Sequence, residues 1–209
     1  MTTVAIFGVS GRTGYALTAA ARGRGWTVRS FCRISSVAPN GAAVIHGAFC
    51  DPERVRAVVE GADAVCCVVG PRAPYGEVFC ADATRAILAA MEAVGCRRLL
   101  CVTGATTGAV PSRSRPFAWL GAWFRWRRPA IARDREAQEA AIAASPLDWT
   151  IVKPPRLTDA SPSGRVAVGP ALPVGLGSSI SRADLANFLL DEIAEPRFVR
   201  QRVIVQRRS

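Results

Sequence analysis

The chain has 209 residues, of which 50% are hydrophobic, and a formal net charge of +11. This length fits one domain whose core needs no disulfide or metal, and no apolar run of about 18 residues predicts a transmembrane helix. The seven cysteines form no CxxC pair and His46 is the only histidine, so the sequence predicts no metal site.

The first residues, "MTTVAIFGVSGRTG", pass directly from an apolar run to glycines. A secretory signal needs a charged leader, a longer apolar stretch and a cleavage site, so we expect a cytoplasmic protein. The basic residues are spread from Arg12 to Arg208, and only Lys153 is a lysine. That spread does not favour a nucleic-acid site, whereas attraction to an anionic cofactor accounts for part of the charge.

Strand and helix patterns alternate along nearly the whole chain. The predicted strands cover residues 4–7, 26–33, 42–47, 62–70, 97–104, 147–155 and 201–206. The predicted helices cover residues 15–25, 51–61, 76–94, 134–145 and 181–195. Such alternation is typical of an α/β protein, and we expect one doubly wound Rossmann domain over residues 1–209, with a mostly parallel sheet and helices on both faces.

Two long irregular segments, 104–130 and 154–180, each follow a predicted strand. Both should therefore lie at the carboxyl edge of the sheet, where open α/β sheets bind ligands. We expect a helical lid at about 109–130 and a substrate-side loop at about 154–180.

The stretch "VAIFGVSGRTG" has a buried strand, then three glycines, then a helix. Gly8 permits a tight turn, Gly11 lets the backbone approach a pyrophosphate, and Gly14 allows close packing of helix on strand. Free amides at the helix start would then bind the phosphates. The predicted phosphate cradle comprises Gly8, Ser10, Gly11, Arg12, Thr13 and Gly14.

The end of the second strand, "FCRISS", predicts which cofactor binds. An NAD site usually places a carboxylate there, whereas an NADP site places a cation. Here Arg33 is followed by Ser35 and Ser36, and Arg12 adds a second cation near the adenosine ribose. The sequence therefore favours NADPH over NADH.

Taken together, the GxxGxxG spacing, "GADAV", and "SPLDWTIVKPPRLTD" resemble the atypical short-chain dehydrogenase/reductases. The closest resemblance is to their NAD(P)H-binding group, which includes NmrA-like proteins and biliverdin-IXβ/flavin reductase, and it covers about residues 4–205. The resemblance implies a Rossmann fold that binds NADPH and often reduces a flavin, quinone or tetrapyrrole. One departure is Ala48, where relatives have an aspartate that contacts adenine, so adenine affinity is expected to be weaker.

The resemblance also assigns cofactor contacts. It implies that the cradle and Arg33 bind the diphosphate and 2′-phosphate, and that Ala48 and Phe49 flank the adenine. It also implies contacts further along the cofactor and near the nicotinamide. The residues of these contacts are Gly70, Pro71, Arg72, Thr103, Gly104, Pro154, Pro155 and Arg156, of which Arg156 is on the substrate side.

Extended members of that superfamily use a Tyr-x-x-x-Lys pair at the start of the helix after strand five. In this chain the corresponding positions are Ile131 and Arg135, and neither side chain can take over the tyrosine's proton transfer. Thr103, Tyr75 and Arg135 remain as catalytic candidates, and Lys153 is expected to be solvated or structural.

Hydride transfer without a dedicated acid suits a conjugated small-molecule acceptor, such as a flavin, quinone or tetrapyrrole. Thr103, Thr106 and Thr107 would orient the acceptor, and Arg72 or Arg156 would stabilise negative charge on it. The alternative is a non-enzymatic sensor that binds NADP(H), as some NmrA-like proteins are. The sequence does not indicate an oligomeric state.

The segment "PFAWLGAWFRWRRP", residues 116–129, has the spacing of a short helix with a broad apolar face. As a lid it would place Trp119 and Trp123 against a flat acceptor. There are three other interpretations of residues 116–128. The segment could contact a membrane surface, form an oligomer interface or be a packed core helix.

Overall fold

In a computed structural model, every residue is described except 34–42, 72–77, 109, 111–113 and 209. The strands are β1 (Thr3–Phe7), β2 (Thr27–Arg33), β3 (Ala43–Gly47), β4 (Ala64–Cys67), β5 (Arg98–Val102), β6 (Asp148–Lys153), β7 (Arg156–Thr158), β8 (Val166–Gly169), β9 (Ser179–Ser181) and β10 (Gln201–Arg207). The helices are α1 (Arg12–Gly23), α2 (Pro52–Val59), α3 (Cys80–Val94), α4 (Arg115–Arg127), α5 (Pro129–Ala144) and α6 (Arg182–Ala194).

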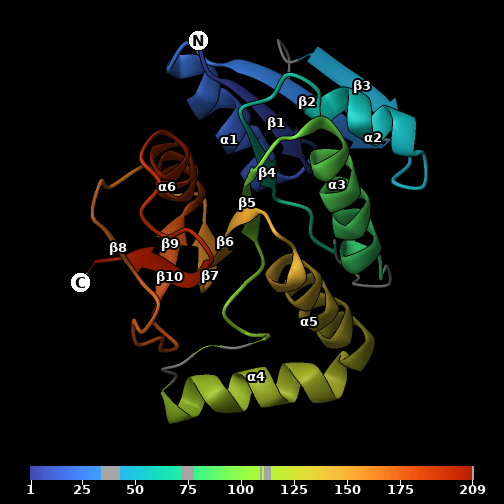
Figure 1. Cartoon of the computed structure of the whole chain (residues 1–209). Coiled ribbons are helices and arrows are strands. Elements are labelled where there is room, and N and C mark those ends of the chain that lie inside the picture. The colour runs from blue at the N-terminus through green and yellow to red at the C-terminus, as the bar shows by residue number, and fades with distance from the viewer. Residues whose placement is uncertain (34–42, 72–77, 109, 111–113, 209) are drawn as a thin grey trace.

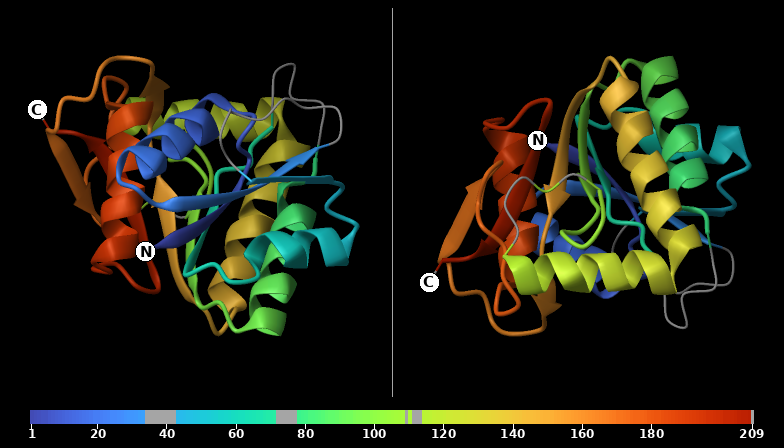
Figure 2. Two further views of the ribbon diagram at one scale, coloured as in Figure 1. Left: turned by 90° about the horizontal axis from the view of Figure 1, so that it is seen from above. Right: turned by 90° about the horizontal axis from the view of Figure 1, so that it is seen from below.

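Eight strands form one sheet in the order β3-β2-β1-β4-β5-β6-β10-β8. All neighbouring pairs are parallel except β10 with β8. α1 and α6 cover one face, and α2, α3 and α5 cover the other (Figures 1 and 2). The predicted doubly wound α/β fold is confirmed, and each predicted strand and helix is present with slightly different ends.

Three short strands were not predicted. β7 and β9 pair with each other as a separate parallel pair, and β8 closes one edge of the main sheet in the antiparallel direction. All three lie in or beside the predicted substrate-side loop. They have three or four residues each, too few for a period-2 pattern to stand out from a loop.

Polar side chains fix the starts of the helices that surround the carboxyl edge. The Asp134 carboxylate on α5 accepts hydrogen bonds from the backbone amides of Cys80 and Ala81, at 2.9 Å each. One helix therefore caps another, because Phe79 at the N-cap of α3 makes no side-chain cap. Asp134 thus sets the position of α5 relative to α3 directly beside the cavity described below.

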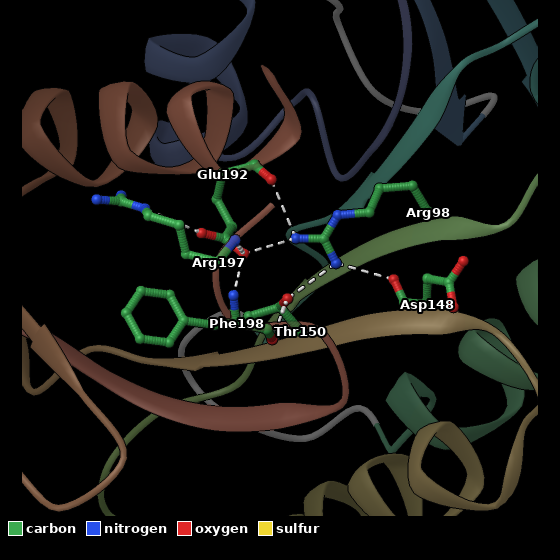
Figure 3. A network of polar contacts seen from close by, with 6 residues as sticks. All are labelled: Arg98, Asp148, Thr150, Glu192, Arg197 and Phe198. Carbon is green, nitrogen blue, oxygen red and sulfur yellow. Dashed lines mark hydrogen bonds and ion pairs between the residues drawn. The ribbon is translucent and has the colours of Figure 1, made fainter. Parts of the chain in front are cut away.

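At the opposite edge of the sheet, a buried cation connects β5, β6 and α6 (Figure 3). Arg98 donates to the Glu192 carboxylate at 2.9 Å and to the Thr150 hydroxyl at 2.9 Å. Glu192 also accepts from the backbone amides of Arg197 and Phe198. Burial lowers the pKa of the Arg98 guanidinium from its ordinary value, although the Glu192 charge opposes that shift. The network therefore holds α6 and the turn after it against the sheet.

Candidate functional site

A cavity of about 410 Å³ opens at the carboxyl ends of β1 and β4. These two strands lie at the point where the strand order reverses, which is where open α/β sheets bind their ligands. Its lining residues are Gly8, Ser10, Gly11, Arg12, Thr13, Phe31, Phe49, Val68, Val69, Gly70, Pro71, Phe79, Val102, Thr103, Arg135 and Leu157.

At two glycines of the predicted cradle, Gly8 and Gly14, close backbone contacts exclude a side chain. Gly8 has φ +96°, and a Cβ there would lie 2.8 Å from the Val68 carbonyl carbon. A Cβ on Gly14 would lie 2.3 Å from the Gly8 oxygen, so α1 begins directly against the loop. At Gly11 the nearest atom is 3.3 Å away, and Gly11 lines the cavity. The first-turn amides of α1 have no intrahelical partner, which makes this helix start suitable for a diphosphate.

Arg12 lines the same cavity, but its guanidinium is already paired. Its Nη1 lies 2.7 Å from one oxygen of Asp159, and Arg182 binds the other oxygen at 2.5 Å. The Asp159 carboxylate therefore joins the cradle to the substrate-side loop and to α6. Arg12 and Asp159 are both exposed, so this pair is available to a ligand that brings its own negative charge.

Two aromatic rings form one end of the cavity wall. Phe31 at the end of β2 and Phe49 after β3 have ring centroids 4.8 Å apart, and both line the cavity. Phe49, which the resemblance expects beside the adenine, is therefore part of the cavity wall. Ala48 is exposed and is not on the wall. The Arg33 backbone ends β2, whereas its side chain, Ser35 and Ser36 lie outside the described residues.

Arg135 is buried on α5 and its guanidinium reaches the cavity. Its Nη1 donates to the Val69 carbonyl at 3.1 Å and to the Gln138 side chain at 2.7 Å. Its Nη2 lies against Gly70, where a Cβ would approach to 2.8 Å. Arg135, at the position that the sequence aligns with the lysine of extended members of the superfamily, thus places a positive charge on the cavity wall. Ile131, at the tyrosine position, is buried.

Behind Thr103, two buried charges form an ion pair. The Thr103 hydroxyl donates to Glu139 Oε1 at 2.9 Å, and the Lys153 ammonium binds the same oxygen. Lys153 also donates to Thr103 Oγ1 at 3.4 Å and to the Thr107 carbonyl at 2.8 Å. Of the two expectations for Lys153, the solvated one is wrong, because only 1% of its side chain is exposed, and the structural one agrees with its buried ion pair.

The other predicted residues are distributed unevenly. Gly70, Pro71 and Thr103 line the cavity, whereas Gly104, Pro154, Pro155 and Arg156 do not. Pro154 is buried beneath the loop after β5, where its carbonyl accepts from Ala105 at 3.0 Å. Arg72 and Tyr75 lie outside the described residues.

Trp119 and Trp123 lie on α4 and are exposed, by 79% and 57%. Neither residue lines the cavity. Only Phe117 and Gly121 of this helix are buried, so the interpretation of α4 as a packed core helix is wrong. The lid role stays a prediction.

Sequence analysis missed several residues of the site. Val68, Val69, Phe79, Val102 and Leu157 form apolar wall, and nothing in their pattern separates them from core. Glu139 had a signal: it follows Arg135 by one helical turn, so the two share a face of α5. A charged residue in the apolar run before Pro154 also signalled that Lys153 needs a buried partner.

A family model described as NAD(P)H-binding matches residues 8–196. Among solved structures, ChuY, an anaerobilin reductase from Escherichia coli O157:H7, is 20% identical with a TM-score of 0.78, over 98% of this chain and 96% of that chain. A candidate NADH-flavin reductase from Streptococcus pneumoniae TIGR4 is 19% identical with a TM-score of 0.79, over 100% of both chains.

A third structure is a short-chain dehydrogenase/reductase from Veillonella parvula DSM 2008 in complex with NADP. It is 17% identical with a TM-score of 0.76, over 98% of this chain and 94% of that chain. At these identities the three structures establish the fold. The family match spans the cradle, Thr103, Arg135 and β6, and with it the whole wall of the cavity at the strand reversal. This chain therefore belongs to the NAD(P)H-binding family of Rossmann-fold proteins.

Proposed function

We propose that this protein is a cytoplasmic NADPH-dependent reductase, formed by a single domain over residues 1–209, that transfers hydride to a conjugated acceptor. A flavin, a quinone or a tetrapyrrole-like molecule is the acceptor class. The observation that carries the proposal is Arg135, a buried cation on the cavity wall at the position where extended members of the superfamily have a lysine. Two of the similar structures are named for reduction of an anaerobilin and a flavin, both of which are conjugated acceptors.

In this proposal one part of the cavity would hold the cofactor and the other the acceptor. The cradle amides and Gly70–Pro71 would hold the diphosphate, with Phe49 against the adenine and Arg33 and Arg72 on the phosphates. NADPH supplies the hydride when bound. Thr103, Arg135 and Leu157 also line the cavity, and in this proposal they would face the acceptor. Arg135 would stabilise negative charge that develops on the acceptor, because a fixed charge in a poorly solvated site needs little reorganisation.

The test is NADPH oxidation with a panel of flavin, quinone and biliverdin acceptors. Wild-type protein should oxidise NADPH with at least one of them and should bind NADPH more tightly than NADH. Arg135→Met should lower kcat by about a hundredfold and leave the NADPH Kd near the wild-type value, since the charge acts on the acceptor. No oxidation with any acceptor would rule out the reductase.

The second candidate is a sensor that binds NADP(H) without turnover. The buried Ile131 at the tyrosine position favours it, because no phenol is available there. For a sensor, NADP⁺ and NADPH should bind equally tightly and no acceptor should be reduced. Calorimetric titration with both cofactor forms separates the two candidates.

In this proposal α4 would act as the expected lid over the acceptor. Trp119, Trp123 and Arg156 do not line the cavity, so they would contact the acceptor only after α4 moves toward it. Trp123→Ala would then raise KM for a bulky acceptor and leave NADPH binding unchanged. An unchanged KM would remove α4 from the acceptor site.

A further inference from the structure

α4 presents a row of tryptophans to the outside of the molecule. Trp119, Trp123 and Trp126 follow at i, i+4 and i+7, so they share one face of the helix. They are exposed by 79%, 57% and 76%. The opposite face of α4 is held to the protein by Phe117, which packs in a small core with Ala105 and Val174. The tryptophan face therefore points away from the core around Phe117. α4 itself lies along the lower side of the molecule in Figure 1.

The charge along α4 and the chain on either side of it has a single sign. Between residues 104 and 133 the chain contains no aspartate or glutamate. Arg115 and Arg127 are exposed at the two ends of α4. A second copy of the chain on this face would bring arginines against arginines in a symmetric interface, which disfavours self-association. Charge complementarity instead requires an anionic partner.

We propose that α4 docks the protein on an anionic lipid bilayer. A helix with tryptophans on one face and arginines beside them lies in the plane of the interface, where the indole rings enter the headgroup region and the guanidiniums pair with lipid phosphates. No helix among the described residues is long and apolar enough to cross a bilayer, so this contact is peripheral. It would bring the protein to lipid-soluble molecules without requiring that it reduce them.

Co-sedimentation with vesicles tests the docking. Wild-type protein should bind vesicles of phosphatidylglycerol and phosphatidylcholine, and bind phosphatidylcholine vesicles at least about tenfold more weakly, because the arginines need anionic lipid. Trp119→Ser with Trp126→Ser, or Arg115→Glu with Arg127→Glu, should each abolish sedimentation. Tyr15→Ser and Arg56→Glu are matched controls, since both residues are exposed on other helices, and should sediment like wild type.

Three outcomes overturn the proposal: no sedimentation with anionic vesicles, equal sedimentation with both vesicle types, or equal binding by the α4 variants. Light scattering on the wild type and the tryptophan variant supplies a further check. A dimer that the tryptophan substitutions dissociate would assign the face to a second copy and also overturn membrane docking.

A separate observation concerns Glu139, whose two carboxylate oxygens have different partners. Oε1 binds Thr103 and Lys153 on the side of the cofactor cavity. Oε2 lies 3.5 Å from Arg202 Nε, and Glu139 lines a second cavity of about 330 Å³ with Glu136 and Arg202. Thr103 lines the cofactor cavity. One carboxylate therefore connects an outer cavity to a hydroxyl on the wall of the proposed acceptor site.

A buried ion pair by itself contributes little net stability, because desolvation offsets the attraction. Here the pair also places a hydroxyl between two ionisable groups and the cavity. Thr103 Oγ accepts a hydrogen bond from Lys153 while its own hydrogen is directed to Glu139. A small rotation about the Thr103 side-chain bond would direct that hydrogen to an acceptor instead.

The geometry points to Thr103 as the proton donor to the reduced acceptor, with Lys153 and Glu139 as its supply, an inference that rests on the proposed reductase activity. Hydride addition gives the acceptor two electrons and one hydrogen. The Thr103 oxygen then releases its proton to the acceptor and takes one from the Lys153 ammonium. Lys153 regains a proton from water in the outer cavity through the Glu139 carboxylate. The net consumption is one NADPH and one proton for each acceptor reduced.

Thr103→Val removes the hydroxyl and keeps the shape of the side chain. It should lower kcat about tenfold or more with a quinone acceptor, as loss of a general acid does, and leave the NADPH Kd unchanged. Thr103→Ser should restore the rate. The wild-type solvent deuterium isotope effect on kcat should disappear in Thr103→Val, a readout that a purely structural role would not change.

Glu139→Gln tests the supply of protons to Thr103. Glu136→Gln is the control, because Glu136 is exposed on the same helix and lines the same outer cavity. Glu139→Gln should change the pH dependence of kcat, and Glu136→Gln should not. If the wild type turns over while Thr103→Val keeps both its rate and its isotope effect, the proton route is wrong and the reductase stands. A wild type that reduces no acceptor overturns both.

Discussion

Two glycines of the cradle and a third at the end of α1 differ in which atoms an added methyl group would contact. This difference separates an effect on folding from an effect on cofactor binding. At Gly14 a Cβ would overlap the Gly8 carbonyl at 2.3 Å, whereas at Gly11 the nearest atom is 3.3 Å away and belongs to the same carbonyl group. At Gly23, in the last turn of the same helix, nothing lies within 4 Å. One substitution at three positions of one chain segment therefore has three physical consequences.

Gly14→Ala should destabilise the protein by about 3 kcal/mol, because the overlap is with backbone that cannot move without displacing α1. Gly11→Ala should unfold near the wild-type midpoint but bind NADPH at least about tenfold more weakly, since its methyl group occupies the space of the diphosphate. Gly23→Ala should be neutral or stabilise by about 0.5 kcal/mol. Thermal unfolding and fluorescence titration measure the three effects, and equal losses in all three variants would contradict this account.

These positions also show which part of the site could be predicted from sequence. The cradle is contiguous, so its glycine spacing and its flanking strand and helix appear in one short stretch. Glu139, Lys153 and Thr103 lie on α5, at the end of β6 and directly after β5. The register of β5 on β6 brings Lys153 beside Thr103, and the packing of α5 on the sheet adds Glu139. Neither the direction of the Glu139 carboxylate nor the pairing of Lys153 can be derived from a linear pattern.

At the scale of elements, α6 depends on a buried carboxylate at its first turn. Asp184 accepts hydrogen bonds from the backbone amides of Ser163 and Gly164, at 2.9 and 3.0 Å, and from the Ser181 hydroxyl at 2.9 Å. Burial raises the pKa of Asp184. These hydrogen bonds together lower it by more, so the net pKa lies below its ordinary value. The same carboxylate thereby fixes both the start of α6 and the turn before β8.

Asp184→Asn should lower the free energy of unfolding at neutral pH by about 2 kcal/mol, the range for hydrogen bonds to a charged group. Because the native pKa is depressed, the stabilisation is present above the unfolded pKa of about 3.9 and is lost as pH falls through the native value. The difference between variant and wild type should therefore shrink in acid.

Denaturant unfolding as a function of pH tests the Asp184 prediction. Asp191→Asn on the same helix is the control, because its ion pair with Arg24 is on the surface, and it should change stability by less than about 1 kcal/mol. A difference between Asp184→Asn and wild type that stays constant down to acid pH would show that the charge of Asp184 is not the cause.

The existence of each long element was predictable from its period and its caps, as at α2, where Asp51 precedes Pro52. The direction in which α4 faces was not. Its apolar residues fall on two faces of the helix, and the sequence alone could not separate the anchored face of Phe117 from the exposed face of Trp119. That distinction depends on the core formed by the loop after β5 and the segment near Val174.

At the scale of the whole molecule, the cysteines show how well the interior is shielded from solvent. Six of the seven are buried and Cys50 alone is exposed. Burial raises the pKa of Cys66 to about 12, of Cys80 to about 12 and of Cys96 to about 11, so these thiols stay protonated at neutral pH. Hydrogen bonding with Cys101 lowers the pKa of Cys67, but both side chains are enclosed between β4, β5 and the helices that cover them.

A thiol reagent at neutral pH should therefore modify Cys50 in the native protein and all seven cysteines after unfolding. Cys50→Ser should remove the fast labelling of the exposed thiol. The slow labelling of the six buried thiols should remain, at a rate set by unfolding. Mass spectrometry of the labelled protein measures the stoichiometry. Fast labelling of a second cysteine would indicate that the sheet opens locally, and a Cys67 adduct would locate that opening next to Arg135.

β10 has a consequence for the order in which the protein assembles. It follows every other element along the chain, yet it lies between β6 and β8, and its Val203, Ile204 and Val205 are buried. As the chain leaves the ribosome, the strands from β3 to β6 can pair with neighbours already made. β8 cannot pair until the last strand arrives, and until then the β6 edge exposes unpaired backbone. Stalled or truncated chains should therefore aggregate through that edge even when their cofactor cradle is already complete.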